Sequence, residues 1–410
     1  MPNPRLAIAT LGLALGWGVS PAWAQPSPEP EGRVAANPPP PGASNPSELQ
    51  PSGRGPDGEP LTDEGEVIFG EATADSIRVE GEDPPVSPMI EPESPPDQPL
   101  RPQHRVEYNN ILGLRYNPLG AVDRLDLFYR YRLYDLPGAL YRDASFGFGL
   151  SPRASPAFAR VGPTLEIKPL TILTIQAGYH FFSHFGTFDL LQGFESALDD
   201  YREVTMEERS ANGEAKAAIG HELQVMAQFL IKVGNVVVRD TLNIYVTQHD
   251  LPAGTTLFYD QRHDILRSNG RPTFVNDLDL VYLTDFGLIA GARFNATHHL
   301  YDAEADYRPG ETVENPNEIL RLGPLFAYRF DDVDPTFRAP TILFLTAWHI
   351  KHRWRTGVEF SPMLPNISLA FVFSGDVWNS NVGWAGSGPT EGEASEGGTD
   401  ASALPSVAAF

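Results

Sequence analysis

The sequence predicts an all-β fold, a transmembrane antiparallel up-and-down β-barrel of about twelve strands over residues 105–375. Three observations favour this fold. Segments of ten or more residues alternate apolar and polar side chains, the connections between them alternate between short and long, and no run of about eighteen apolar residues follows the N-terminal leader. Because only helices and closed barrels satisfy their backbone groups inside a bilayer, such a chain, if it lies in a membrane, must cross it with strands.

The alternation is simplest near residue 370, where Ile367, Leu369, Phe371 and Phe373 point to one face and the residues between them to the other. A helix would repeat every 3.6 residues instead. A soluble sandwich or lipocalin-like barrel also alternates, but its packed inner face is apolar, whereas here the second face carries charged side chains on nearly every segment. The expected strands are 105–116, 121–134, 140–150, 155–168, 171–184, 214–233, 235–248, 272–284, 286–300, 317–331, 339–352 and 365–375.

The lengths of the connections test this interpretation. Outer-membrane barrels have short periplasmic turns and longer external loops, and both chain ends lie in the periplasm. With that orientation, the expected periplasmic turns include Pro169-Leu170 and Gly234-Asn235, which are short. The expected external loops include 185–213, 249–271 and 301–316, which are the three longest. Aromatic residues lie near the expected strand ends, as interfacial girdles do: Tyr116, Tyr129, Phe181, Phe330 and Trp348.

The two ends of the chain differ in composition from the expected barrel region. Residues 1–24 resemble a signal peptide, with Arg5 before a short apolar run and Ala22-Trp23-Ala24 as the cleavage pattern. Residues 25–104 are rich in proline, with about 16 acids against 4 arginines, so we expect a disordered periplasmic segment. Residues 376–410 form an acidic low-complexity tail. These segments hold most of the formal charge of -23, which argues against a nucleic-acid partner.

The face of the expected strands that points into the barrel is basic, although the whole chain is acidic. Its acids include Glu107, Asp126, Asp143, Glu166, Glu222, Asp277 and Asp279. One interpretation is that these charges pair across strands and only satisfy one another. The other is a lumen that attracts anions, because guanidinium groups suit carboxylates and phosphates. The basic residues expected to line the lumen and bind anions are Arg115, Arg124, Arg130, Arg132, Arg160, Lys168, Lys232, Arg239, Arg293, Arg321, Arg329 and Lys351.

With its expected strand count and these lumen arginines, the barrel region resembles the small monomeric porins for acidic oligosaccharides, which have twelve strands and arginine-lined lumens. The resemblance concerns architecture alone and implies a passive outer-membrane channel for small, anionic solutes in a Gram-negative bacterium. A second hypothesis is a structural or scaffolding barrel whose lumen is occluded by ion pairs. Under either hypothesis, the expected partners of the chain are the lipid bilayer, lipopolysaccharide and the barrel-assembly machinery. We place the recognition signal for this machinery at Phe373 rather than Phe410.

A third hypothesis is a lipid-hydrolysing enzyme. Outer-membrane phospholipases and lipid A deacylases carry a His-x-Ser pair on the outer barrel face, and none of the ten histidines here has that spacing. His263 with Ser268 is the closest candidate, while Ser183 and His184 should point to opposite faces. We therefore expect no catalytic residues.

No metal or cofactor is expected. The chain contains no cysteine, which excludes thiolate ligands and disulfides. His298 and His299 are adjacent in an expected strand, so their side chains diverge and do not form a metal site. The acids of the first long loop, between Asp189 and Glu208, are expected to be ordinary solvated surface rather than a cation site.

Overall fold

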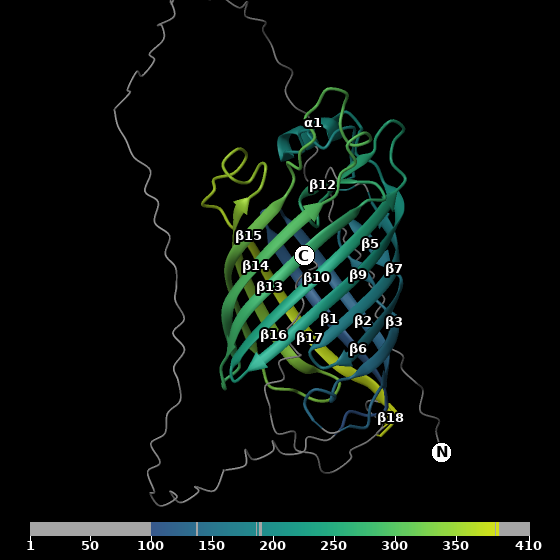
Figure 1. Cartoon of the computed structure of the whole chain (residues 1–410), viewed down its shortest axis with the longest axis vertical. Coiled ribbons are helices and arrows are strands. Elements are labelled where there is room, and N and C mark those ends of the chain that lie inside the picture. The colour runs from purple at the N-terminus through teal and green to yellow at the C-terminus, as the bar shows by residue number, and fades with distance from the viewer. Residues whose placement is uncertain (1–99, 137, 186, 188–190, 382, 385–410) are drawn as a thin grey trace, which may run out of the picture. The chain divides into compact units, whose positions relative to one another are not determined.

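The computed structural model describes residues 100–136, 138–185, 187, 191–381 and 383–384. The predicted signal peptide, nearly all of the Pro-rich segment, Asp189 and the tail beyond Trp384 lie outside these residues. The described chain forms a closed antiparallel barrel of twelve strands, with each strand paired to its sequence neighbour (Figure 1). The last strand pairs with the first and closes the barrel, for example where Val372 lies opposite Ile111.

Two of the twelve strands of the wall are interrupted, so that β3 continues into β4 and β5 continues into β6. In chain order, the wall consists of β1 (His104–Tyr116), β2 (Gly120–Arg132), β3 (Ser145–Leu150) with β4 (Arg153–Ala154), β5 (Phe158–Val161) with β6 (Pro163–Leu170), β7 (Leu173–His184), β9 (Ala218–Val233), β10 (Val236–His249), β13 (Pro272–Leu283), β14 (Leu288–His299), β15 (Ile319–Arg329), β16 (Arg338–Lys351) and β17 (Asn366–Asn379).

The barrel has two different ends, which we call the loop end and the turn end. The loop end carries the long connections 185–217, 250–271, 300–318 and 352–365, and α1 (Glu203–Ala211) lies there (Figure 1). The turn end carries the short connections after β6, β9 and β13, together with β18 (Gly383–Trp384), which pairs with the end of β17. The predicted alternation of short and long connections is therefore confirmed for these segments.

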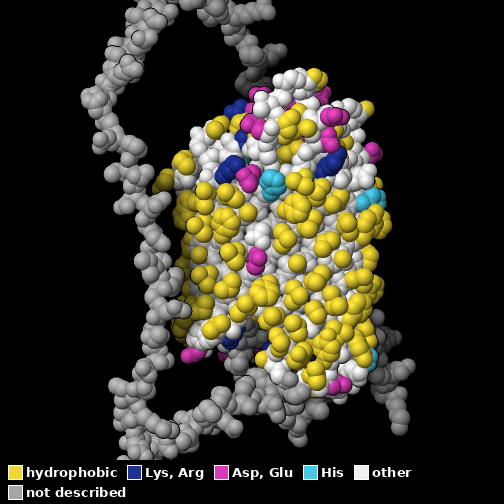
Figure 2. All heavy atoms as spheres, in the orientation of Figure 1, with side chains coloured by type: hydrophobic (Ala, Val, Ile, Leu, Met, Phe, Trp, Pro, Cys, Tyr) yellow, Lys and Arg dark blue, Asp and Glu magenta, His cyan; other side chains and the backbone are white. Residues whose placement is uncertain are grey.

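Side-chain alternation gives the wall its two faces. On β3, Phe146, Phe148 and Leu150 are exposed, whereas Ser145 and the glycines between them are buried. Apolar side chains cover the outer face of the wall in Figure 2, as contact with lipid tails requires. All five aromatic residues predicted near strand ends are exposed on this face. No helix in the described part of the chain is long and apolar enough to cross a membrane.

The structure differs from the prediction at several strand ends, among them the start of β9, which is Ala218 rather than residue 214. The third strand begins at Ser145 rather than at residue 140, because residues 139–143 form a turn. Asp143, which we expected on the lumen face of that strand, lies in this turn instead and pairs with Arg101 at 3.2 Å. The last wall strand continues to Asn379, four residues beyond the predicted end, because its C-terminal part pairs with the start of β1.

A small internal sheet was not predicted. β11 (Leu257–Asp260) and β12 (Ile265–Ser268) form a hairpin, and β8 (Gly193–Phe194) pairs with β11. All eight residues of the two hairpin strands are buried. The hairpin belongs to a connection that we expected to be an external loop, and its side chains pack with Phe158 and Phe182 of the wall.

Candidate functional site

In the turn-end half of the lumen, Arg130 is surrounded by carboxylates. Its Nη1 donates to Glu107 Oε2 at 2.5 Å, and its Nε donates to Glu166 Oε1 at 2.8 Å. Gln176 donates to the second oxygen of Glu166 at 2.6 Å. Arg132 also pairs with a carboxylate, that of Asp135 in the next connection. The charges of these two predicted lumen arginines are therefore largely neutralised.

On the opposite part of the wall, two arginines share one acid. Arg239 on β10 donates to Asp279 on β13 from Nε at 3.0 Å and from Nη2 at 2.5 Å. Arg293 on β14 donates to the same carboxylate from Nε at 2.6 Å and from Nη2 at 2.9 Å. All three side chains are almost completely buried. The triad itself thus has two cations and one anion, and the nearby Asp277 carboxylate also attracts both arginines.

The hairpin of β11 and β12 reaches the wall through Arg262, at its tip. Arg262 donates to Glu222 on β9 from Nη1 at 3.0 Å and from Nη2 at 2.5 Å. Glu222 also accepts hydrogen bonds from Arg160 on β5 and, at 2.8 Å, from Thr247 on β10. Its side chain has no exposed surface. One buried carboxylate thus ties the hairpin tip to three strands of the wall.

Asp264 fixes the other side of the tip. It pairs with Arg355 in the connection before β17, with His352 Nε2 at 3.0 Å, and accepts the Tyr259 hydroxyl at 2.9 Å. Asp264 also adopts a positive φ of 59°, which is uncommon outside glycine. We call the contacts of Asp264 with Arg355 and His352 the latch.

The surroundings of the hairpin tip lower the pKa values of its two carboxyl groups, so that both stay ionised. Burial raises the pKa of Asp264, but the charges and hydrogen bonds of Arg355 and His352 together outweigh burial and hold that pKa well below its usual range. In the same way, burial at Asp260 is outweighed by Arg262, His263 and Arg267 together, which keep the pKa of this carboxyl low. Burial lowers the pKa of His263 to about 4, although Asp260, 3.0 Å away, acts in the opposite direction.

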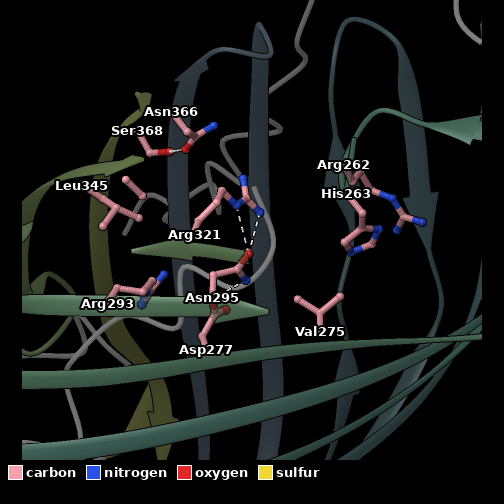
Figure 3. A pocket seen from close by; sticks show the side chains of 11 residues that line it. Arg262, His263, Val275, Asp277, Arg293, Asn295, Arg321, Leu345, Asn366 and Ser368 are labelled. Atoms are coloured by element: carbon pink, nitrogen blue, oxygen red, sulfur yellow. Dashed lines mark hydrogen bonds between the residues drawn. The ribbon is translucent and has the colours of Figure 1, made fainter. Parts of the chain in front are cut away.

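A cavity of about 40 Å³ lies between the hairpin tip and the wall. Arg262 and His263 face it from one side, and Arg293 and Arg321 face it from the other (Figure 3). Asp277 is the acid among its lining residues. This volume is enough for a few water molecules. The hairpin tip forms one side of it and so occupies part of the lumen at this level.

Two of the predicted lumen arginines have no carboxylate partner within the described residues. Arg321 donates from Nε and Nη2 to Asn295 Oδ1, at 3.0 and 2.8 Å. Arg115 donates only to backbone carbonyls, including those of Gln261 at 2.7 Å and Arg262 at 2.8 Å in the hairpin tip. Amide and carbonyl oxygens satisfy the guanidinium hydrogen bonds without cancelling their charge. Arg321 therefore leaves positive charge beside the cavity, and Arg115 leaves it beside the hairpin tip.

The other residues predicted to line the lumen lie at different depths. Arg124 pairs with Asp126 at 2.7 Å, and Lys168 lies 3.6 Å from Glu166. Arg329 reaches Asp332 at 3.5 Å, at the turn end, where Lys232 is exposed. Lys351 lies at the rim of the loop end, where it is half exposed and pairs with Glu318 at 2.5 Å. The predicted set is thus one face of the barrel rather than one site.

The residues considered for catalysis do not meet. His263 contacts Asp260, while the Ser268 hydroxyl donates to Asp306 at 2.8 Å. Ser183 and His184 are neighbours on β7 and point to opposite faces. His298 and His299 diverge as predicted, and within the described residues no three His, Asp or Glu side chains are grouped to hold a metal ion.

Sequence reasoning missed the inserted hairpin and its partner Arg355. Arg262, Asp264 and Arg355 lie in connections, where the two-residue period gives no information about direction. The signal present in the sequence was a pair of short apolar segments, 257–259 and 265–266, on either side of a charged turn. Such a pattern is typical of a hairpin with a buried tip.

The fold and this charged interior define the class of the chain: it is a transmembrane β-barrel protein with a lumen narrowed by its own hairpin. No family model matches the sequence, and no curated protein matches it. Among solved structures, the chain is similar to one described as KdgM porin, with 7% identity and a TM-score of 0.31 over 65% of this chain and 98% of that chain.

Two further solved structures are similar to the chain. One is the NanC porin, with 10% identity and a TM-score of 0.30 over 65% of this chain and 98% of that chain. The other is the translocator domain of the autotransporter NalP from Neisseria meningitidis, with 10% identity and a TM-score of 0.28 over 66% of this chain and 88% of that chain. The description of this chain as a closed barrel rests on its own strand pairing.

Proposed function

We propose that this chain is a passive channel for small anionic solutes in the outer membrane of a Gram-negative bacterium. The observation that carries the proposal is Arg321, which lines a narrow cavity inside a closed barrel and has no ion-pair partner within the described residues. The guanidinium of Arg115 likewise lacks a carboxylate partner and contacts the hairpin tip. Fixed positive charge in a narrow, low-dielectric passage concentrates anions and repels cations. The apolar outer face would contact the bilayer, and the loop end, with its long connections, would face the outside.

The test is the reversal potential of the refolded chain, residues 25–410, in planar bilayers under a salt gradient. We expect anion preference, and we expect Arg321→Gln to reduce it because this guanidinium faces the cavity without a carboxylate partner. Lys351→Gln is the matched control, since this cation is half exposed at the rim and already paired. Cation preference in the unchanged protein would contradict the proposal.

The inserted hairpin favours a second candidate, a structural barrel with an occluded lumen. Here the tip contacts of Arg262 and Asp264 would be permanent, and the barrel would serve as an anchor for the N-terminal segment. A folded barrel that remains silent in bilayers, even when the latch is removed, is the result that distinguishes this candidate from the channel.

A further inference from the structure

Three arginines lie side by side on the lumen face near the loop end. Arg124 on β2 is directly opposite Arg153 on β4, and Arg153 is directly opposite Arg160 on β5. Like charges at directly opposed positions destabilise a sheet unless something neutralises them. We call these three residues the arginine row.

The acids near the arginine row do not balance it. Asp126 pairs with Arg124 at 2.7 Å. Glu222 pairs with Arg160, but the same carboxylate also accepts two hydrogen bonds from Arg262 of the hairpin. The row together with its neighbours therefore keeps an excess of positive charge.

Arg153 is the residue that carries this excess. Its residue surface is 4% exposed. Its one hydrogen bond within the described chain is a long one, from Nη2 to Gln224 Oε1 at 3.5 Å, and its Nε has no partner. The Nε of Arg160 also has no partner, while its Nη2 donates to the same Gln224 oxygen at 2.8 Å.

A buried arginine cannot relieve this situation by losing its proton, because its guanidinium remains charged in proteins. An isolated buried charge is strongly unfavourable unless a counter-ion reaches it. The two orphan Nε–H groups, on neighbouring arginines, are donors of the kind that a planar or tetrahedral oxyanion accepts.

We propose that the arginine row is a binding site for a small oxyanion, a single carboxylate or phosphate group carried by a solute in the lumen, with Arg153 as its main ligand. The site lies on the wall strands β2, β4 and β5, whereas the cavity described above is lined from β13 to β17 and the hairpin tip. The inference goes beyond the proposed channel, since a retained anion is expected whether or not the barrel conducts.

The experiment is isothermal titration of the refolded chain, residues 25–410, with inorganic phosphate at constant ionic strength, followed by acetate. We expect one saturable site, and we expect Arg153→Gln to weaken phosphate binding by at least about tenfold, since it removes charge-assisted hydrogen bonds. Arg132→Gln is the matched control, because this arginine lies at the turn end and has its own carboxylate partner. Absence of saturable binding to the unchanged protein overturns the proposal.

A second variant covers the case in which Arg153→Gln does not fold. Arg153→Lys keeps the positive charge and removes the planar fork, so we expect phosphate affinity to fall while the barrel remains folded. Affinity equal to that of the unchanged protein in either variant would assign binding elsewhere and overturn the role of Arg153. Binding is measured without ion flow, so failure of this site and failure of the channel are separate results.

Discussion

The latch at Asp264 gives the most direct test of how the hairpin narrows the lumen. Replacing this residue with alanine removes the acceptor of Arg355, His352 and the Tyr259 hydroxyl in one step. The side chains of Asp264 and Arg355 are each 3% exposed, so water does not replace the lost partner. The substitution leaves Arg355 buried without a carboxylate at 4 Å or less, other than the partly exposed Glu203 at 3.9 Å.

Removing one member of a buried ion pair costs about 3–5 kcal/mol. Applied to the balance between inserted and displaced hairpin, this corresponds to a change of roughly 150- to 5,000-fold. The contacts of Arg262 with Glu222 remain in the variant, so we expect a mobile hairpin in a folded barrel rather than loss of the barrel.

The assay uses the absence of cysteine from the chain. Ser368 lies on β17, is 3% exposed and lines the cavity beneath the hairpin tip. A Ser368→Cys reporter should react slowly with a thiol reagent in the otherwise unchanged barrel and much faster when Asp264→Ala is added. Asp332→Ala, which breaks a half-exposed pair at the turn end, is the control and should not change the rate. Equal rates in all three proteins would refute the latch.

Two further predictions use the same reporter or the same barrel. Because burial lowers the pKa of His263 to about 4, this imidazole stays neutral in the inserted hairpin, whereas in a displaced hairpin it takes up a proton near pH 6.5. The inserted state has its full stability above pH 6.5 and loses up to about 3 kcal/mol as the pH drops through 4. Labelling at Ser368→Cys should therefore accelerate in acid, and His263→Gln should make the labelling rate less dependent on pH. A labelling rate of the unchanged hairpin that does not depend on pH would contradict this role of His263. Asp240 lies on the outer face of β10 and accepts a hydrogen bond from Asn276 at 2.7 Å. Because a charge on the lipid face destabilises a barrel, Asp240→Leu should raise the urea midpoint of unfolding in lipid vesicles by the equivalent of about 1 kcal/mol. A lower midpoint would show that this polar pair stabilises the wall.

The wall could be predicted from the sequence because one physical rule determines it. A strand between lipid and an enclosed polar interior must alternate, and the two-residue period assigns each residue to a face once the register is known. The rule assigns Arg160, Arg239 and Arg293 to the inner face, and all three are buried in the structure. The rule does not say which charges pair, since Arg239 and Arg293 meet over Asp279 through the register of three strands.

The connections between strands do not follow this rule, and one of them, the inserted hairpin, occupies part of the lumen. Residues 257–268 were expected outside the barrel because long connections usually face solvent. Arg153 was missed for a similar reason: it lies in the short β4, at a position between two predicted strands. In both cases the deciding contacts join residues far apart in sequence, such as Asp264 and Arg355.

The charges of the hairpin explain why it is stable inside a basic lumen and yet depends on few contacts. Asp260 and Arg267 pair within the hairpin at 2.6 Å, so this part enters the barrel already neutralised. Arg262 also pairs with Asp260 inside the hairpin, at 3.0 Å, and reaches a second partner outside it. The acid Asp264 pairs with Arg355, which lies outside the hairpin. Arg262 finds Glu222, but Glu222 retains Arg160 if the hairpin leaves. Asp264 and Arg355 have no comparable substitute for each other, so the latch rather than the Arg262 contact should set the free energy of displacement.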